Sequence, residues 1–148
     1  MSARVHHSAI VVRDVDTSLR FWRDGIGFDV LMDMSFDGDW TALFGARSNR
    51  LRSIFLGDPA HADAGIVELV QFEQGADGGA SATAPREGFF LLSCFVELDA
   101  TLARLGDLGL GGTPRRITVP APGSGDVQMA TVVDPDGVLV ELIELPSS

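Results

Sequence analysis

The sequence predicts an α+β fold in which a strand–helix–strand–strand–strand unit occurs twice within a single domain, residues 1–148. Three observations predict it. The order of apolar strands and one helix in the first half recurs in the second half. The last strand of each half carries a glutamate, Glu68 or Glu141, at the centre of an apolar run. Between a first module (1–74) and a second module (89–148), residues 75–88 have the Gly-, Ala-, Ser-, Thr- and Pro-rich composition of a linker.

The first module is expected to begin with a strand over Val5–Val12. Asp16 is a favourable N-cap for the helix that follows, in which apolar residues recur at helical spacing up to Gly27. Three more strands are predicted at Phe28–Met34, Leu51–Leu56 and Ile66–Phe72.

The second module repeats this order, with a strand over Phe90–Leu98 and a helix over Thr101–Leu108. Three more strands are predicted at Arg115–Val119, Val127–Val133 and Val138–Leu145. The turn Asp134-Pro-Asp-Gly137 joins the last two, with Pro and Gly at positions that suit a tight turn. Four strands with one open face bury little by themselves, so both modules are expected to form one domain.

Composition limits the partners that the protein can have. The formal net charge is −10, which argues against nucleic acid or an anionic membrane surface as the ligand. A single cysteine, Cys94, excludes an intramolecular disulfide, and the first residues contain no apolar signal-peptide core. We therefore expect a cytoplasmic protein that binds a small molecule, with no membrane and no nucleic-acid partner.

The two strand glutamates are the strongest indication of a site. Alternate residues of a strand share a face, so Glu68 shares its face with Ile66 and Val70, and Glu141 shares its face with Ile143. An unpaired polar group on an apolar face costs about 2–7 kcal/mol. A metal ion, a basic partner or a water-filled cavity would compensate that cost.

Two segments resemble the vicinal oxygen chelate superfamily. The opening segment His7–Asp14, followed by Ser18–Phe28, is similar to the amino-terminal motif of that family, and Asp134–Gly137 followed by Val140–Leu142 is similar to its carboxy-terminal signature. The family includes glyoxalase I, methylmalonyl-CoA epimerase, extradiol dioxygenases and the fosfomycin and bleomycin resistance proteins. The resemblance implies paired βαβββ modules whose sheets curl around a shared cavity, commonly with a divalent metal, and commonly a two-fold homodimer.

Carried over residue by residue, the resemblance implies His7, Glu68 and Glu141 as metal ligands. The fourth family position, counted seven residues before Asp99, is Leu92, which cannot bind a metal. One imidazole and two carboxylates suit Ni, Co, Mn, Zn, Fe or Mg. The alternative is a vestigial site without metal. Leu92 and Cys94, which share a strand face, are expected to line the cavity.

The favoured function is a lyase or isomerase of glyoxalase or epimerase type, which removes a proton next to a carbonyl with the help of the metal. Glu141 or Glu68 would be the catalytic base. A non-catalytic, antibiotic-sequestering binding protein without metal is the alternative. An extradiol-type dioxygenase is less favoured, because such iron sites usually contain two histidines.

Two further groups of side chains have open interpretations. Phe36, Trp40, Leu43 and Phe44 could form an apolar lid over the cavity or pack in the core. Arg47, Arg50 and Arg52 could hold an anionic substrate, although a solvated run of arginines is the simpler interpretation.

Overall fold

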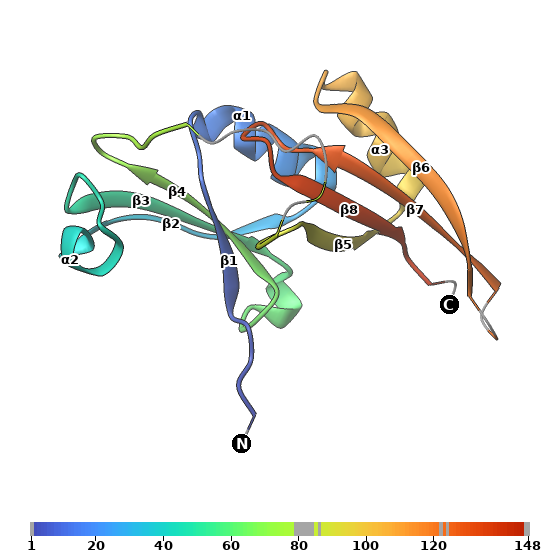
Figure 1. The fold of residues 1–148 in the computed structure, drawn as a ribbon, viewed down its shortest axis with the longest axis horizontal. Helices are drawn as coiled ribbons and strands as arrows, with labels where there is room; N and C mark the ends of the chain where they lie inside the picture. The colour runs from blue at the N-terminus through green and yellow to red at the C-terminus, as the bar shows by residue number, and fades with distance from the viewer. Residues whose placement is uncertain (1, 79–84, 86, 122, 124, 147–148) are drawn as a thin grey trace.

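The structure, a computed structural model, describes residues 2–78, 85, 87–121, 123 and 125–146. The predicted α+β fold of two βαβββ modules is confirmed, and Figure 1 shows the two sheets side by side with helices against them. The linker 75–88 lies partly outside the described residues. The first module contains β1 (His7–Val11), α1 (Val15–Leu19), η1 (Arg20–Ile26), β2 (Asp29–Asp37), α2 (Trp40–Phe44), β3 (Arg50–Gly57), η2 (Pro59–His61) and β4 (Ile66–Phe72).

The second module has the same strand plan as the first. Its elements are β5 (Leu92–Val96), α3 (Leu98–Asp107), β6 (Gly111–Ala121), β7 (Gly125–Val133) and β8 (Leu139–Glu144). The strand order is β1-β4-β3-β2 in one sheet and β5-β8-β7-β6 in the other. In each sheet the first strand pairs in parallel with the last, and the other pairs are antiparallel.

The helices differ from the expectations in three respects. The first helix is capped by Asp14 and not by Asp16, because the Asp14 carboxylate accepts hydrogen bonds from the backbone N–H groups of Asp16 and Thr17. Helix α3 begins at Leu98, three residues before the predicted start at Thr101, and its N-cap residue is Glu97. The short helix α2 was not predicted, since its five residues are too few to show helical spacing.

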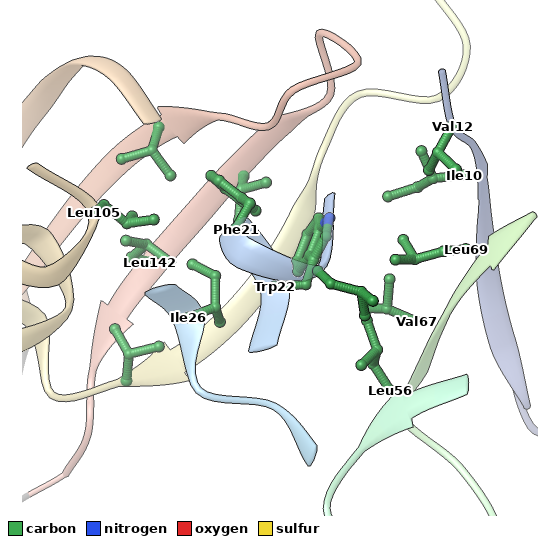
Figure 2. Close-up of a cluster of buried hydrophobic side chains, with 14 of the residues drawn as sticks. Ile10, Val12, Phe21, Trp22, Ile26, Leu56, Val67, Leu69, Leu105 and Leu142 are labelled. Carbon is green, nitrogen blue, oxygen red and sulfur yellow. The ribbon is translucent and has the colours of Figure 1, made fainter. Parts of the chain in front are cut away.

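The core lies where the helices pack against the sheets. Phe21 and Trp22, both fully buried, come from η1, and in Figure 2 they stand among core side chains of both modules. Leu56 and Leu69 belong to the first sheet and Leu142 to the second, and all three belong to the same buried cluster. Burying one such side chain stabilises the fold by about 1.5–3 kcal/mol. The shared cluster holds the two modules together as one unit.

The helices of the two modules meet at a glycine. A Cβ atom on Gly25 would lie 2.4 Å from Cδ2 of Leu105, which is 1% exposed and belongs to α3. The Arg104 guanidinium also donates a hydrogen bond of 3.1 Å to the Gly25 carbonyl. A side chain at this position would push against the buried Leu105, so glycine favours the close approach of η1 and α3.

The Asp134–Gly137 turn is a second link between the modules. The buried Asp134 carboxylate accepts hydrogen bonds from the backbone N–H groups of Asp136 (2.9 Å) and Val138 (2.8 Å) within the turn. Its other oxygen accepts from the Trp22 indole N–H of the first module at 3.3 Å. Burial raises the pKa of Asp134, and these hydrogen bonds partly oppose that shift. The role of this turn is structural.

Each sheet has a second face that this core leaves uncovered. Among the side chains exposed there are Phe95, Ile117 and Val133 of the second sheet, at 64%, 60% and 40% exposure. The helices in the described part of the chain are all too short or too polar to cross a membrane.

Candidate functional site

An apolar pocket of about 860 Å³ occupies the open face of the first sheet. Its floor is made by residues of β1, β3 and β4, with residues of β2 and α2 at one side. The volume lies within the roughly 300–1,000 Å³ that is usual for small-molecule sites. His7 and Glu68 are the polar pair on this floor.

His7 and Glu68 come together as the sequence predicts. Glu68 lies on the central strand β4, directly opposite Ala9 of β1, and His7 lies two residues before Ala9 on the same face. The His7 Nε2 atom is 3.4 Å from Glu68 Oε1, and the two side chains are 38% and 16% exposed. This separation is longer than a usual N–H···O hydrogen bond of about 2.7–3.2 Å.

Two neighbours of this pair were not predicted as site residues. The Ser53 hydroxyl on β3 donates a hydrogen bond to Glu68 Oε2. The His6 and His7 Nδ1 atoms are 2.8 Å apart, so one of them must carry the proton between them. Phe55 of β3 lies directly opposite Glu68, and Ser53, two residues earlier, faces the same side of the sheet. A hydroxyl at that position of the strand is the feature of the sequence that could have identified Ser53.

Glu141 occupies the matching place in the second sheet but does not join His7 and Glu68. It lies directly opposite Ser93 of β5, whose hydroxyl donates to Glu141 Oε1 at 2.9 Å. Among the described residues, the apolar pocket is lined by the first module and by Gly75, Ala76 and Asp77 of the linker, and by none of the second module. Within the described residues no three His, Cys, Asp or Glu side chains come close enough to hold a metal ion. One chain thus presents two separate polar groups, His7 with Glu68 on the first sheet and Glu141 with Ser93 on the second.

The expectation that Leu92 and Cys94 line the cavity is corrected. Leu92 pairs with Val140, whose side chain is fully buried, and both Leu92 and Cys94 pack against the hydrophobic core. They therefore face the helices, whereas Ser93 faces the side of Glu141. By the same alternation, the residue that corresponds to His7 is Leu91, two positions before Ser93.

Cys94 has the environment of an inert thiol. Burial raises its pKa to about 11, so the thiol stays protonated at neutral pH. A thiol in this state is a poor nucleophile and a poor metal ligand, which agrees with its place in the core.

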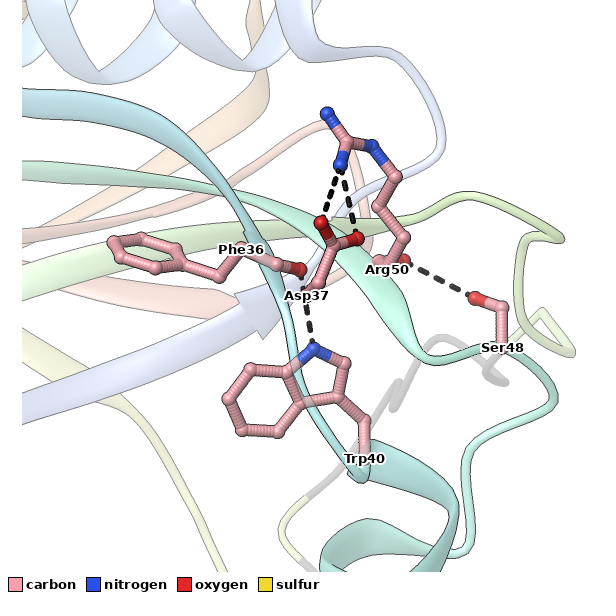
Figure 3. A network of polar contacts seen from close by, with 5 residues as sticks. All are labelled: Phe36, Asp37, Trp40, Ser48 and Arg50. Atoms are coloured by element: carbon pink, nitrogen blue, oxygen red, sulfur yellow. Dashed lines mark hydrogen bonds and ion pairs between the residues drawn. The ribbon is translucent and has the colours of Figure 1, made fainter.

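Aromatic residues of β2 and α2 form one side of the pocket. Phe36, Trp40 and Phe44 line it, whereas Leu43 is 67% exposed and does not. The Trp40 and Phe44 rings stack at 5.7 Å with an interplanar angle of 14°. Figure 3 shows the Trp40 indole N–H donating to the Phe36 carbonyl at 3.3 Å. Of the two interpretations, a wall over the cavity is the one the structure supports.

All three arginines of the basic run are paired with aspartates. Arg50 bonds both oxygens of Asp37 at 2.9 and 3.0 Å (Figure 3). Arg52 bonds Asp33, and the guanidinium of Arg52 lowers the pKa of that carboxyl. Arg47 pairs with Asp77. Arg50 and Arg52 line a more polar cavity of about 870 Å³, which adjoins the apolar pocket and shares Val11, Leu51 and Phe72 with it.

Comparison with known proteins agrees with this architecture. The model of the glyoxalase/bleomycin resistance protein/dioxygenase superfamily matches residues 4–142. The chain is 36% identical over 148 aligned residues to the lactoylglutathione lyase-like protein terB of Aspergillus terreus, covering 96% of this chain and 75% of terB.

Solved structures resemble the chain in fold. A glyoxalase family protein from Bacillus cereus, APC24694, aligns with a TM-score of 0.72 at 18% identity, covering 97% of this chain and 95% of that one. Glyoxalase I of Leishmania major, described as trypanothione-dependent, aligns with a TM-score of 0.60 at 24% identity, covering 97% and 87% of the two chains.

Proposed function

This chain belongs to the glyoxalase/bleomycin resistance protein/dioxygenase superfamily, and from that premise we propose that it is a metal-assisted lyase or isomerase that removes a proton next to a carbonyl. The observation that carries the proposal is the His7–Glu68 pair on the floor of an apolar pocket. A small oxygenated molecule fits such a pocket, and the pair, with Ser53 beside it, supplies polar groups on a floor that is otherwise apolar.

The geometry of the pair fits two ligands of one divalent ion. Two ligand atoms at about 2.1 Å from an ion stand roughly 3.0–3.4 Å apart in octahedral or tetrahedral geometry. The His7 Nε2 to Glu68 Oε1 distance of 3.4 Å falls at the upper end of that range. The Ser53 hydroxyl, bonded to the other oxygen of Glu68, fixes the carboxylate from behind. Nickel, cobalt, manganese, zinc, iron or magnesium would suit one imidazole with carboxylates.

A second copy of the chain would complete the site. Two ligands hold an ion weakly, and Glu141 of the same chain does not reach them. The sheet face that carries Glu141 also carries the exposed side chains Phe95, Ile117 and Val133, which a two-fold partner would cover. A homodimer in which each first sheet faces the partner's second sheet would contain two equal sites.

Glu68 and Glu141 have different roles in this arrangement. The bound ion would act as a Lewis acid on the substrate oxygens and stabilise developing negative charge. One oxygen of Glu68 accepts from Ser53 and the other faces His7 Nε2 at 3.4 Å, which suits a carboxylate that shares an ion with His7. Glu141 is held through Oε1 by Ser93, and no described residue donates to Oε2. That free oxygen makes Glu141 the better candidate for the base that takes the proton.

The alternative, a binding protein without catalysis, needs only the pocket. The apolar lining and the incomplete ligand set of a single chain favour it. Extradiol oxygenation is less supported, because His6 approaches the Nδ1 side of the His7 ring whereas Glu68 lies at Nε2. The three groups therefore do not surround one point.

Exchange of carbon-bound hydrogen tests the proposal. Protein incubated in D₂O with Ni²⁺ or Mn²⁺ is given phenacyl alcohol or the glutathione–methylglyoxal hemithioacetal, and loss of the hydrogen next to the carbonyl is followed by NMR. We expect metal-dependent exchange with at least one substrate, reduced by about 10²–10⁴ in Glu141→Gln. Saturable ligand binding with no exchange under any condition would favour the binding protein.

A further inference from the structure

Five aromatic residues besides His7 line the apolar pocket. Phe36, Trp40, Phe44, Phe55 and Phe72 all line it, and they come from α2 and from three strands of the first sheet. The His7 ring lies 5.5 Å from the Phe55 ring, so the aromatic surface reaches the polar pair. Flat apolar surfaces of this kind favour flat, apolar ligands, because aromatic rings gain from stacking beyond simple burial.

The Trp40 side of this surface is held in place before any ligand arrives. Asp39 caps α2 by accepting from the Ala42 backbone N–H at 3.1 Å, and the Asn49 side chain accepts from the Thr41 N–H at 3.2 Å. The Trp40 indole N–H is already bonded to the Phe36 carbonyl. Trp40 therefore offers a ligand the face of its ring and not a hydrogen-bond donor.

The pocket has little to offer an anionic ligand. Among the described residues, the cations that line it are Arg47, which is paired with Asp77, and His7, whose ring lies beside Glu68. On the described strands of the face that a second copy would add, the one cation is Arg115 of β6, directly opposite Thr131, which itself lies opposite Glu141. A glutathione conjugate brings two carboxylates, and each would need a cationic partner on leaving water.

We infer that the pocket takes a planar aromatic or conjugated small molecule, neutral overall, which stacks on Trp40 and directs an oxygen atom towards His7 and Glu68. The inference rests on the proposed function, which supplies the reaction, and adds the class of substrate. That class is an oxygenated aromatic compound and not a glutathione conjugate.

Calorimetric titration with two probes tests the substrate class. The first is 2-naphthol, a neutral planar ring system with one oxygen; the second is S-hexylglutathione, an apolar chain on a glutathione with two carboxylates. The variants are Trp40→Ala, Trp40→Phe and Leu43→Ala. Leu43 is the matched control, because it lies on the same helix, is 67% exposed and does not line the pocket.

We expect saturable binding of 2-naphthol to the native protein and no comparable binding of S-hexylglutathione. Trp40→Ala should weaken 2-naphthol binding about tenfold or more, Trp40→Phe should recover most of it, and Leu43→Ala should leave it unchanged. Tighter binding of S-hexylglutathione, no saturable binding of 2-naphthol, or equal effects of Trp40→Ala and Leu43→Ala would overturn the inference.

The binding measurement separates the substrate class from the proposed function, because it needs neither metal nor turnover. Failure to bind 2-naphthol refutes the class even where hydrogen exchange occurs with the hemithioacetal. Binding of 2-naphthol with the expected variant pattern supports the class, even where the exchange experiment fails and refutes the lyase or isomerase function.

Discussion

Asp134→Asn should destabilise the protein by about 2 kcal/mol, because it removes the hydrogen bond by which Trp22 of the first module donates to the Asp134 carboxylate of the second. Asparagine keeps the shape of the side chain, and its one carbonyl oxygen can still accept from the Asp136 and Val138 backbone N–H groups. Its amide NH₂ then faces the Trp22 indole N–H, which the Asp134 carboxylate accepts at 3.3 Å in the native protein. Trp22 is 0% exposed, so water cannot replace the lost acceptor. A buried donor left unsatisfied costs roughly 1–3 kcal/mol.

Urea unfolding, followed by circular dichroism, measures this loss. A cost of 2 kcal/mol is a substantial part of the roughly 5–15 kcal/mol typical of a domain, and it should lower the melting temperature by about 4–8 °C. The control is Asp126→Asn, which removes the same charge from an exposed position of β7 and should change stability by less than about 0.5 kcal/mol. Equal stability of the two variants would refute the structural role of the turn.

Three further predictions concern the packing of Gly25, the burial of Cys94 and the strand that lies beside Glu141. Gly25→Ala should destabilise the protein by about 1–3 kcal/mol in urea unfolding, because the added methyl group meets the buried Leu105; a neutral result would mean that the helices can separate there. Cys94 should react with iodoacetamide at pH 8 far more slowly in the folded than in the urea-unfolded protein, since burial raises its pKa to about 11; equal rates would contradict its burial. Leu91→His should tighten divalent metal binding in calorimetry, whereas Leu92→His should only lower the melting temperature, because Leu92 packs on the core. Tighter metal binding by Leu92→His and not by Leu91→His would contradict the strand register.

The fold could be predicted because each module repeats one pattern and each strand has a clear apolar period. The strand Ile66–Phe72 was predicted with its observed bounds, and Glu68 falls at its centre. The Asp134–Gly137 turn was also predicted, but its hydrogen bonds to the first module were not. Turn chemistry is local and visible in sequence, whereas the partner of a buried carboxylate depends on how the two modules pack.

The site was predicted in part, and the errors have physical causes. His7 and Glu68 meet because parallel pairing of β1 with β4 fixes their faces. Leu92 was misplaced because the spacing between strand and helix differs in the two modules: His7 lies seven residues before the N-cap Asp14, whereas Leu91 lies six residues before the N-cap Glu97. Since alternate strand residues face opposite sides, an error of one position moved the side chain from the open face to the core. Glu141 is separated from His7 because of the way the two modules pack, and the apolar periodicity of the strands does not predict that packing.

The central claim is that each site combines His7 and Glu68 of one copy with Glu141 of a second. Mixing inactive Glu68→Gln and Glu141→Gln proteins, under conditions that let subunits exchange, tests it most directly. Half of the resulting dimers are then mixed and one of the two sites in each is intact, so hydrogen exchange should return to roughly a quarter of the native rate. If all three residues act within one chain, every copy carries a defect, and the mixture should stay as inactive as its components. A monomeric mass by light scattering in an active native protein would contradict the claim as well.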